Sequence, residues 1–372
     1  MAYTVTQKFK DIIYSGYSNN TAKLSIGGTI IPTSNIKSIK ASNPIISKDK
    51  MCLGTFISNQ LEITFRNMDN VPLTGDIYLE IGVKVDNAYE YVPIGYFIID
   101  DLKEDYYTTC KITCLDRAVK MKTNVDISKQ VPISAKNLLI WLCQKYNIVL
   151  GTYPLINNDV ITNMYDSSYS GKKYVSMIAE IMGGFAKFGR DGKLYIIPLK
   201  RDSIATINAK KSKSFQKKEL YKITRVVYED AIRKFEYGTP TNNTLYISND
   251  NFFITDTTVI QNIYNAVLNT EIWSLKTENY ADISLDCWDY ITYTIDNKNY
   301  ITLNNNSYIY EQNIMSKVDV DIDIKSKQEN TNKVVSNDKE QIRILKTEIN
   351  QATGEIALLN KKVETVEVKI EK

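Results

Sequence analysis

The chain contains no histidine, and this absence excludes a large group of catalytic mechanisms. Ser-His and Cys-His nucleophiles and His-ligated zinc centres all require an imidazole, so this sequence cannot build them. It also shows no signal peptide and no apolar run long enough to span a membrane. We therefore expect a protein that is made in a cytoplasm and that has no membrane binding of its own.

Cysteine is sparse, with five residues scattered along 372. The closest pair, Cys110 and Cys114, lies on a strand-like run, where four residues span about 13 Å and exceed the reach of a disulfide. We interpret these two and Cys52, Cys143 and Cys287 as small buried apolar residues in a reducing compartment.

Neither sign of charge is in excess, because 46 basic side chains are matched by 43 acidic ones. No overall field therefore draws the chain toward nucleic acid or an anionic membrane, and we expect no sequence-specific nucleic-acid partner. The densest basic run, from Lys210 to Lys218, has no glycine-rich loop beside it. We interpret this run as a solvated linker rather than a phosphate-binding site.

Alternating apolar and polar residues dominate the first third of the chain. Leu61, Ile63 and Phe65 alternate with polar residues, and the segment 77–85 repeats this period of two. Such a period indicates strands with one buried and one solvent-facing side. Together with a short helix expected over 5–16, the pattern predicts a closed or nearly closed antiparallel barrel, the first tube-like domain, over residues 1–120.

Helical spacing replaces this alternation between residues 121 and 215. Apolar residues recur every three to four positions in 134–151 and again in 171–184, which predicts two amphipathic helices. After the second helix, Asp191 and Gly192 predict the turn of a hairpin with positive φ at both residues. We therefore predict an α/β insert domain over 121–215.

Strand-like segments return after residue 215. They include 221–238, 244–248, 251–255 and 271–280, and one helix is expected over 258–270. We predict a second barrel-like tube domain over 216–327, followed by a polar hinge. The predicted fold class is mainly β (α+β), with two barrel-like domains and an α/β insert between them.

The segment 328–372 is predicted to contain the hinge and a C-terminal parallel coiled coil that begins near Ser336. Apolar residues occupy two interleaved series with a period of seven, which is the pattern of a coiled-coil seam. We expect this seam to oligomerise the chain. Its residues are Ile342, Leu345, Ile349, Ala352, Ile356, Leu359, Val363, Val366 and Ile370.

One dense carboxylate cluster invites a catalytic interpretation. Asp100, Asp101, Glu104 and Asp105 could supply the two acids of a glycosidase. A strand follows them directly, and no apolar pocket that would raise one pKa is visible in the sequence. A surface turn is the favoured interpretation.

Two further groups of residues have the spacing of possible sites. Asp319, Asp321 and Asp323 alternate with strand-forming residues and lack the glycine of a calcium loop, so a solvent-facing strand is favoured. Ser336 and Lys339 have the spacing of a serine-lysine nucleophile, but helix capping explains them better. The sequence assigns no catalytic residue, cofactor or metal, and we predict that the protein is not an enzyme.

Several segments together resemble a known family. They are VTQKFKDIIYSG, LGTFISNQLEITFRN, IYLEIGVKV, EYVPIGYFIIDDLKEDYYTTCKITCLDRAV and KKYVSMIAEIMGGFAKFGRDGKLYIIPL, and they span most of residues 1–200. The chain resembles the tail hub, or tail-associated-lysin, proteins of the baseplate of Firmicutes phages and of phage-tail-like bacteriocins. Its second half departs from the family, because DISLDCWDYITYTID stands where a Gly-Asp is common.

The resemblance implies a homotrimeric structural hub that closes or continues the distal end of a sixfold tail tube. It implies a place in the virion after assembly in the host bacterial cytoplasm. The implied partners are the tail tube, distal tail and baseplate proteins, the tape measure protein and a tip or spike protein. Two alternatives remain: a tail-associated peptidoglycan hydrolase (glycosidase or endopeptidase), and a host-glycan adhesin built on the tyrosine-rich strands.

The coiled-coil pattern and the family resemblance imply different numbers of chains in the oligomer. The a positions of the heptad hold only Ile or Val, and two of the d positions hold Leu. This pattern favours parallel dimers, whereas the resemblance implies a trimer. We predict that contacts of the barrel-like domains set a trimer and that the coil follows.

Overall fold

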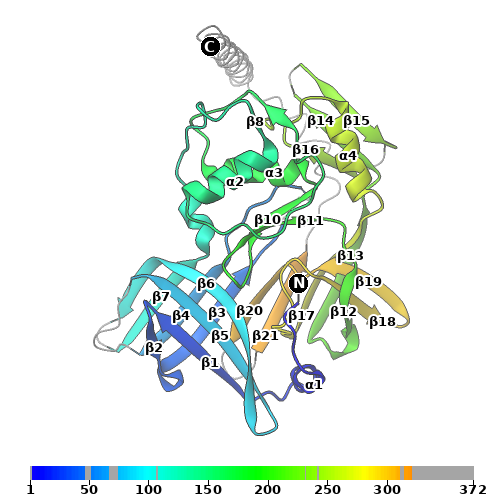
Figure 1. The fold of residues 1–372 in the computed structure, drawn as a ribbon. Helices are drawn as coiled ribbons and strands as arrows, with labels where there is room; N and C mark the ends of the chain where they lie inside the picture. The colour runs from blue at the N-terminus through cyan, green and yellow to red at the C-terminus, as the bar shows by residue number, and fades with distance from the viewer. Residues whose placement is uncertain are drawn as a thin grey trace.

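A computed structural model describes residues 2–46, 52–66, 74–105, 108–230, 232–240, 243–310 and 314–320. Strands predominate over helices in it, as the mainly β prediction requires. No helix within these ranges is both long and apolar enough to cross a membrane. Figure 1 shows two tiers, a lower tier made mostly of strands and an upper tier that carries most of the described helices.

An 11-stranded sheet dominates the lower tier. Its strands follow the order β13-β17-β21-β20-β3-β4-β7-β6-β5-β1-β2. Their bounds are β1 (Asn20–Ile26), β2 (Thr29–Ile31), β3 (Ile36–Asn43), β4 (Gln60–Arg66), β5 (Asp76–Val85), β6 (Ala88–Asp105), β7 (Thr109–Leu115), β13 (Ser214–Lys222), β17 (Glu271–Tyr280), β20 (Asn306–Tyr310) and β21 (Ile314–Val320).

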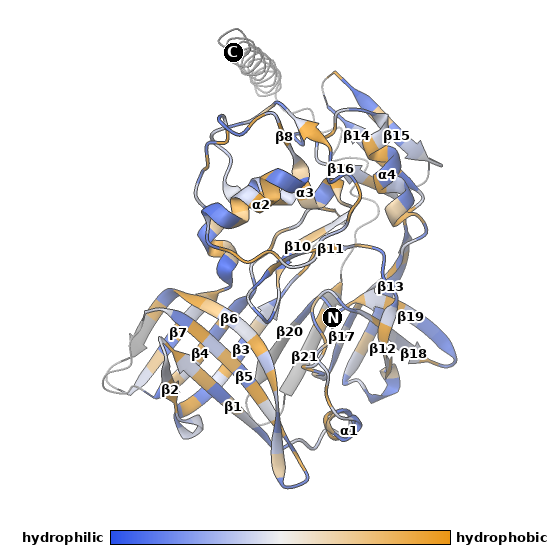
Figure 2. Ribbon diagram, viewed as in Figure 1, coloured by the Kyte–Doolittle hydropathy of each residue, from blue (hydrophilic) through white to orange (hydrophobic). Residues whose placement is uncertain are grey.

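The predicted alternation is visible on these strands. Leu61, Ile63 and Phe65 of β4 are buried and their neighbours are less so, and hydrophobic and hydrophilic positions alternate along the sheet (Figure 2). The predicted N-terminal helix is α1 (Gln7–Ser15), which is capped by the Thr6 side chain and ended by Gly16 at φ 78°. Its Phe9 and Ile13 pack into the same core as β1 to β7.

A closed or nearly closed barrel was predicted for the first domain, and the described strands do not form the closed version. The reason lies at β3, which pairs with β4 on one side and with β20 on the other. A strand more than 260 residues away in sequence thus occupies the edge that closure would need. The sheet therefore runs from the predicted first domain, 1–120, into the predicted region 216–327.

The upper tier contains the predicted insert helices. They are α2 (Ala135–Lys145) and α3 (Gly171–Ile181), and they are accompanied by β8 (Ile133–Ser134), β9 (Ile161–Thr162), β10 (Gly184–Phe188) and β11 (Leu194–Pro198). The β10–β11 hairpin was predicted, but only Gly192 of its turn has positive φ, at 72°. Asp191 stabilises the turn in another way, because its carboxylate accepts from the backbone N–H of Lys193.

Each tier also contains a three-stranded sheet. The upper tier holds the sheet β15-β14-β16 with α4 against it, and the lower tier holds the sheet β12-β18-β19 (Figure 1). The bounds are β12 (Ser203–Asn208), β14 (Arg225–Glu229), β15 (Lys234–Gly238), β16 (Thr244–Ile247), α4 (Thr257–Val267), β18 (Tyr290–Ile295) and β19 (Lys298–Leu303). Short 3₁₀ turns lie at Thr33–Asn35, Arg117–Met121 and Ala209–Lys211.

Two local predictions in this region were wrong. The segment 251–255 forms turns rather than a strand. The basic run is not a linker, because its second half belongs to β13, which pairs with β17. As an edge strand β13 has one side open to solvent, where lysines are well tolerated. Lys217 lies over the rings of Trp273 and Tyr300, with its amine 5.6 and 5.1 Å from their centroids.

The predicted coiled coil lies outside the described residues. The same holds for the hinge from 328 and for Asp321, Asp323, Ser336 and Lys339. The predicted seam, Ile342, Leu345, Ile349, Ala352, Ile356, Leu359, Val363, Val366 and Ile370, therefore stays a prediction.

Candidate functional site

The two tiers and the N-terminal segment meet at residues 281–289, here called the junction loop. All nine of its residues are buried, although three of them are aspartates. The backbone N–H of Tyr3 donates to Ser284 O at 2.7 Å, and the Tyr14 hydroxyl of α1 donates to Asp282 Oδ2 at 2.7 Å. The junction loop therefore binds the N-terminal segment, although the two are some 270 residues apart in the sequence.

Arg190, at the tip of the β10–β11 hairpin, reaches from the upper tier into this junction. Its Nε donates to Asp286 Oδ1 at 2.5 Å, its Nη2 to Leu285 O and its Nη1 to Pro93 O of β6, both at 2.8 Å. The side chains of Arg190 and Asp286 are 16% and 9% exposed, so the pair is shielded from water. One guanidinium thus ties together the insert hairpin, the first half of the large sheet and the junction loop.

A cavity of about 640 Å³ lies beside this ion pair. Its walls combine the indole of Trp288 and the phenol of Tyr195, whose rings are 6.0 Å apart, with Arg201. The guanidinium of Arg201 lies 3.7 Å from Asp289 Oδ1, which is an ion contact longer than a hydrogen bond. Burial and the neighbouring Asp286 raise the pKa of Asp289. The volume is that of a small-molecule pocket.

A second link between the tiers is the buried side chain of Lys187 in β10. Its amine donates to Pro44 O at 2.6 Å and to Ile57 O at 2.8 Å, on the segment between β3 and β4. Burial lowers the pKa of Lys187, and the nearby Cys287 and Asp116 oppose part of that change. The amine therefore joins β10 to the segment that follows β3 by two hydrogen bonds.

Glu180 of α3 is the corresponding buried anchor within the upper tier. Its Oε1 accepts from the N–H and the hydroxyl of Ser248, and its Oε2 accepts from Asn251 Nδ2, each at 2.8 Å. Burial raises the pKa of Glu180, and the donors from Asn251 and Ser248 oppose that rise. The carboxylate therefore fixes the segment after β16 onto helix α3.

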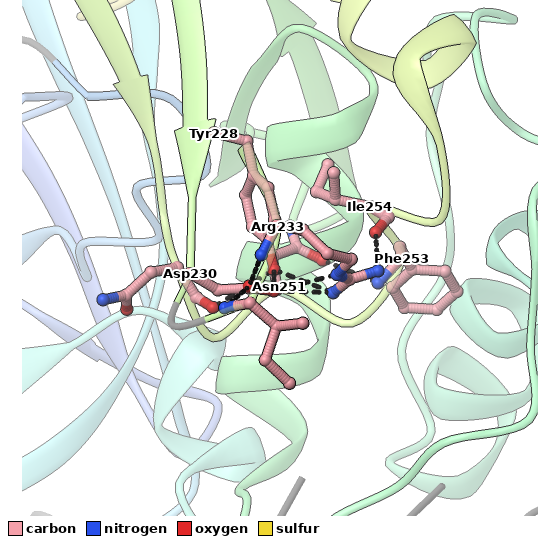
Figure 3. Close-up of polar contacts among 8 residues, drawn as sticks. Tyr228, Asp230, Arg233, Asn251, Phe253 and Ile254 are labelled. Atoms are coloured by element: carbon pink, nitrogen blue, oxygen red, sulfur yellow. Dashed lines mark hydrogen bonds and ion pairs between the residues drawn. The ribbon is translucent and has the colours of Figure 1, made fainter. Parts of the chain in front are cut away.

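Arg233 extends this network, as Figure 3 shows. Its Nη2 donates to Asp230 Oδ2 at 2.8 Å and to the Tyr228 hydroxyl at 3.1 Å, and its Nη1 donates to Ile254 O at 3.0 Å. The arginine thus joins the β14–β15 turn to the segment that precedes α4. Like Arg190, Lys187 and Glu180, it uses side-chain hydrogen bonds to hold segments together.

The carboxylate cluster predicted from sequence is not part of this junction. Asp100 and Asp101 lie exposed on β6, and the side chains of Glu104 and Asp105 lie outside the described part. Asp319 lies in β21, where it pairs with Lys276 of β17. Within the described ranges, no group of three or more cysteine, aspartate or glutamate residues could hold a metal ion.

Four of the five cysteines are buried, as predicted, and Cys52 is partly buried. None of the five forms a disulfide in the described structure. The sequence analysis did not single out the residues of the junction loop. The available signal was three aspartates set among apolar residues in ADISLDCWD, where carboxylates need buried partners.

The fold is similar to those of solved phage tail proteins. No protein-family model matches the chain, and no curated protein matches its sequence. Among solved structures, it is similar to the 43 kDa tail protein of prophage MuSo2 from Shewanella oneidensis, with a TM-score of 0.55 and 9% identity over 82% of this chain and 97% of that one. It is also similar to the prophage tail protein gp18 from Listeria monocytogenes, with a TM-score of 0.50 and 8% identity over 88% and 99%. At these identities the likeness shows a shared fold, and both neighbours are phage tail proteins.

Proposed function

We propose that the chain is a structural, non-enzymatic component of the tail of a phage or phage-tail-like particle, and that it forms the hub of the tail tip or baseplate. The observation that carries the proposal is the fold shared with the MuSo2 tail protein over 97% of that protein. The segments over residues 1–200 that resemble tail hub proteins support the same assignment. The proposed partners are the tail tube, distal tail and baseplate proteins, the tape measure protein and a tip or spike protein.

The way that the buried polar side chains are used supports a structural role. Arg190, Lys187 and Glu180 donate to or accept from groups in other segments, and they tie together parts of the chain up to 143 residues apart. This arrangement is suited to a rigid scaffold that transmits contacts between neighbouring tail proteins.

Particles assembled without this chain test the proposed function. We expect negative-stain images of the deletion to show tails without a completed tip, and complementation with the wild-type gene to restore them. Normal infectious tails in the deletion would rule out the structural role. Clearing of peptidoglycan by the purified chain in a zymogram, if lost in Asp101→Ala, would favour the hydrolase alternative. Saturable binding on a glycan array would favour the adhesin.

We further propose that the chain is a homotrimer, with the C-terminal coil following the contacts of its β-rich regions. The proposed division is 1–120, 121–215, 216–327 and 328–372, and two tube-like units in each of three chains would match a sixfold tube. Light scattering should give three times the protomer mass of 42.6 kDa. Ile349→Asn or Ile356→Asn should weaken the assembly because each buries a polar amide in the seam. A stable dimer at micromolar concentration would contradict the trimer.

A further inference from the structure

A second, smaller cavity also borders the Arg190–Asp286 pair. Its volume is about 30 Å³, and it is lined by the ends of β3, β10 and β20, by the residue before β4 and by the junction loop. Arg190 and Asp286 are both among the lining residues, so the cavity borders the same ion pair. A cavity needs roughly 10 to 15 Å³ to hold one water molecule, so this one has sufficient room.

Two amide oxygens in the cavity wall accept no hydrogen bond from the described part of the protein. They are Asn59 Oδ1, from the residue before β4, and Asn306 Oδ1, from the first residue of β20. Both atoms are buried, and the Asn306 residue is only 9% exposed. A buried acceptor without a donor costs about 1 to 3 kcal/mol, so native proteins almost always supply a donor.

The carboxylates in the same wall already have donors. Asp282 Oδ1 accepts from the N–H and hydroxyl of Ser284, and its Oδ2 accepts from Tyr14. Asp286 Oδ1 accepts from Arg190. What the cavity still requires is a small donor that reaches two neutral amide oxygens.

We propose that this cavity is a structural water site in which ordered water donates to Asn59 Oδ1 and Asn306 Oδ1. Water fits because it has two O–H donors and is small enough for the volume. A metal cation fits less well, because Arg190 already neutralises Asp286 and three hydrogen-bond donors already occupy both oxygens of Asp282. The water joins the start of β4 to the start of β20, and so connects the N-terminal strands to the C-terminal hairpin.

A high-resolution crystal structure of the full chain tests the site directly. The expected result is a density peak within about 2.5 to 3.0 Å of both amide oxygens. A dry cavity would overturn the proposal. So would a peak surrounded by six or more oxygens at about 2.3 to 2.6 Å, which is the geometry of calcium.

Variants at Asn306 provide a second readout. Asn306→Asp keeps the acceptor and should keep the water, whereas Asn306→Leu should expel it and leave Asn59 without its donor. We expect Tm to fall by about 2 to 4 °C in Asn306→Leu. Asn299→Leu, on an exposed position of β19, is the matched control and should leave Tm within about 1 °C of the wild type. Equal Tm values for Asn306→Leu and wild type, with unchanged density, would also overturn the proposal.

Discussion

Arg190→Met is expected to lower the free energy of unfolding by about 3 to 5 kcal/mol, because it removes one partner of a buried ion pair. Asp286, 9% exposed, would keep its charge and lose the guanidinium at 2.5 Å. The carbonyls of Pro93 and Leu285 would lose a donor as well. The measurement is equilibrium unfolding in urea at neutral pH.

Lys193→Met is the matched control for this variant, since it lies in the same hairpin. Its amine pairs with Asp191 at 3.2 Å, but the two side chains are 46% and 42% exposed, so the loss should stay below about 1 kcal/mol. The double variant Arg190→Met/Asp286→Asn should recover part of the stability by neutralising the carboxylate. Equal losses in Arg190→Met and Lys193→Met would contradict the role given to the buried pair.

Lys187→Met is expected to lower the free energy of unfolding by about 2 kcal/mol or more, because two buried carbonyls lose their donors. The loss should depend on pH. Burial lowers the pKa of Lys187 in the folded chain, whereas the unfolded lysine keeps a pKa near its ordinary 10.5. Between these two values the unfolded chain binds more protons, so the wild type gains stability as the pH rises.

The gain can amount to about 1.4 kcal/mol per pH unit within that window. The difference in the free energy of unfolding between wild type and Lys187→Met should therefore grow as the pH rises through that window toward 10.5. Comparing the two proteins at each pH cancels the titration of the many tyrosines, which both share. Lys23→Met, at a position 56% exposed, is the control and should show no such growth. A constant difference across the range would show that Lys187 stays charged when buried.

The helices and strands that form the junction could be predicted from the sequence, but the contacts between them could not. The hairpin that carries Arg190 follows from its turn residues, and α1 from its cap and its terminal glycine. Nothing local indicates that Arg190 meets Asp286, because 96 residues separate them and each also reads as an ordinary surface charge. The buried amine of Lys187 and the carboxylate of Glu180 are similar: their helical or strand positions are predictable, but their distant partners are not.

The sequence by itself determined the mainly β character, the period-two strands such as β4 and the apolar faces of α2, α3 and α4. These features depend on side-chain periodicity over a few residues, which the chain displays directly. Only the tertiary structure decided that β20 pairs with β3, that β12 pairs with β18 and that no barrel closes among the described strands. Strand pairing is made by backbone N–H and C=O groups that every residue carries, so the choice among possible partners depends on the packing of the whole chain.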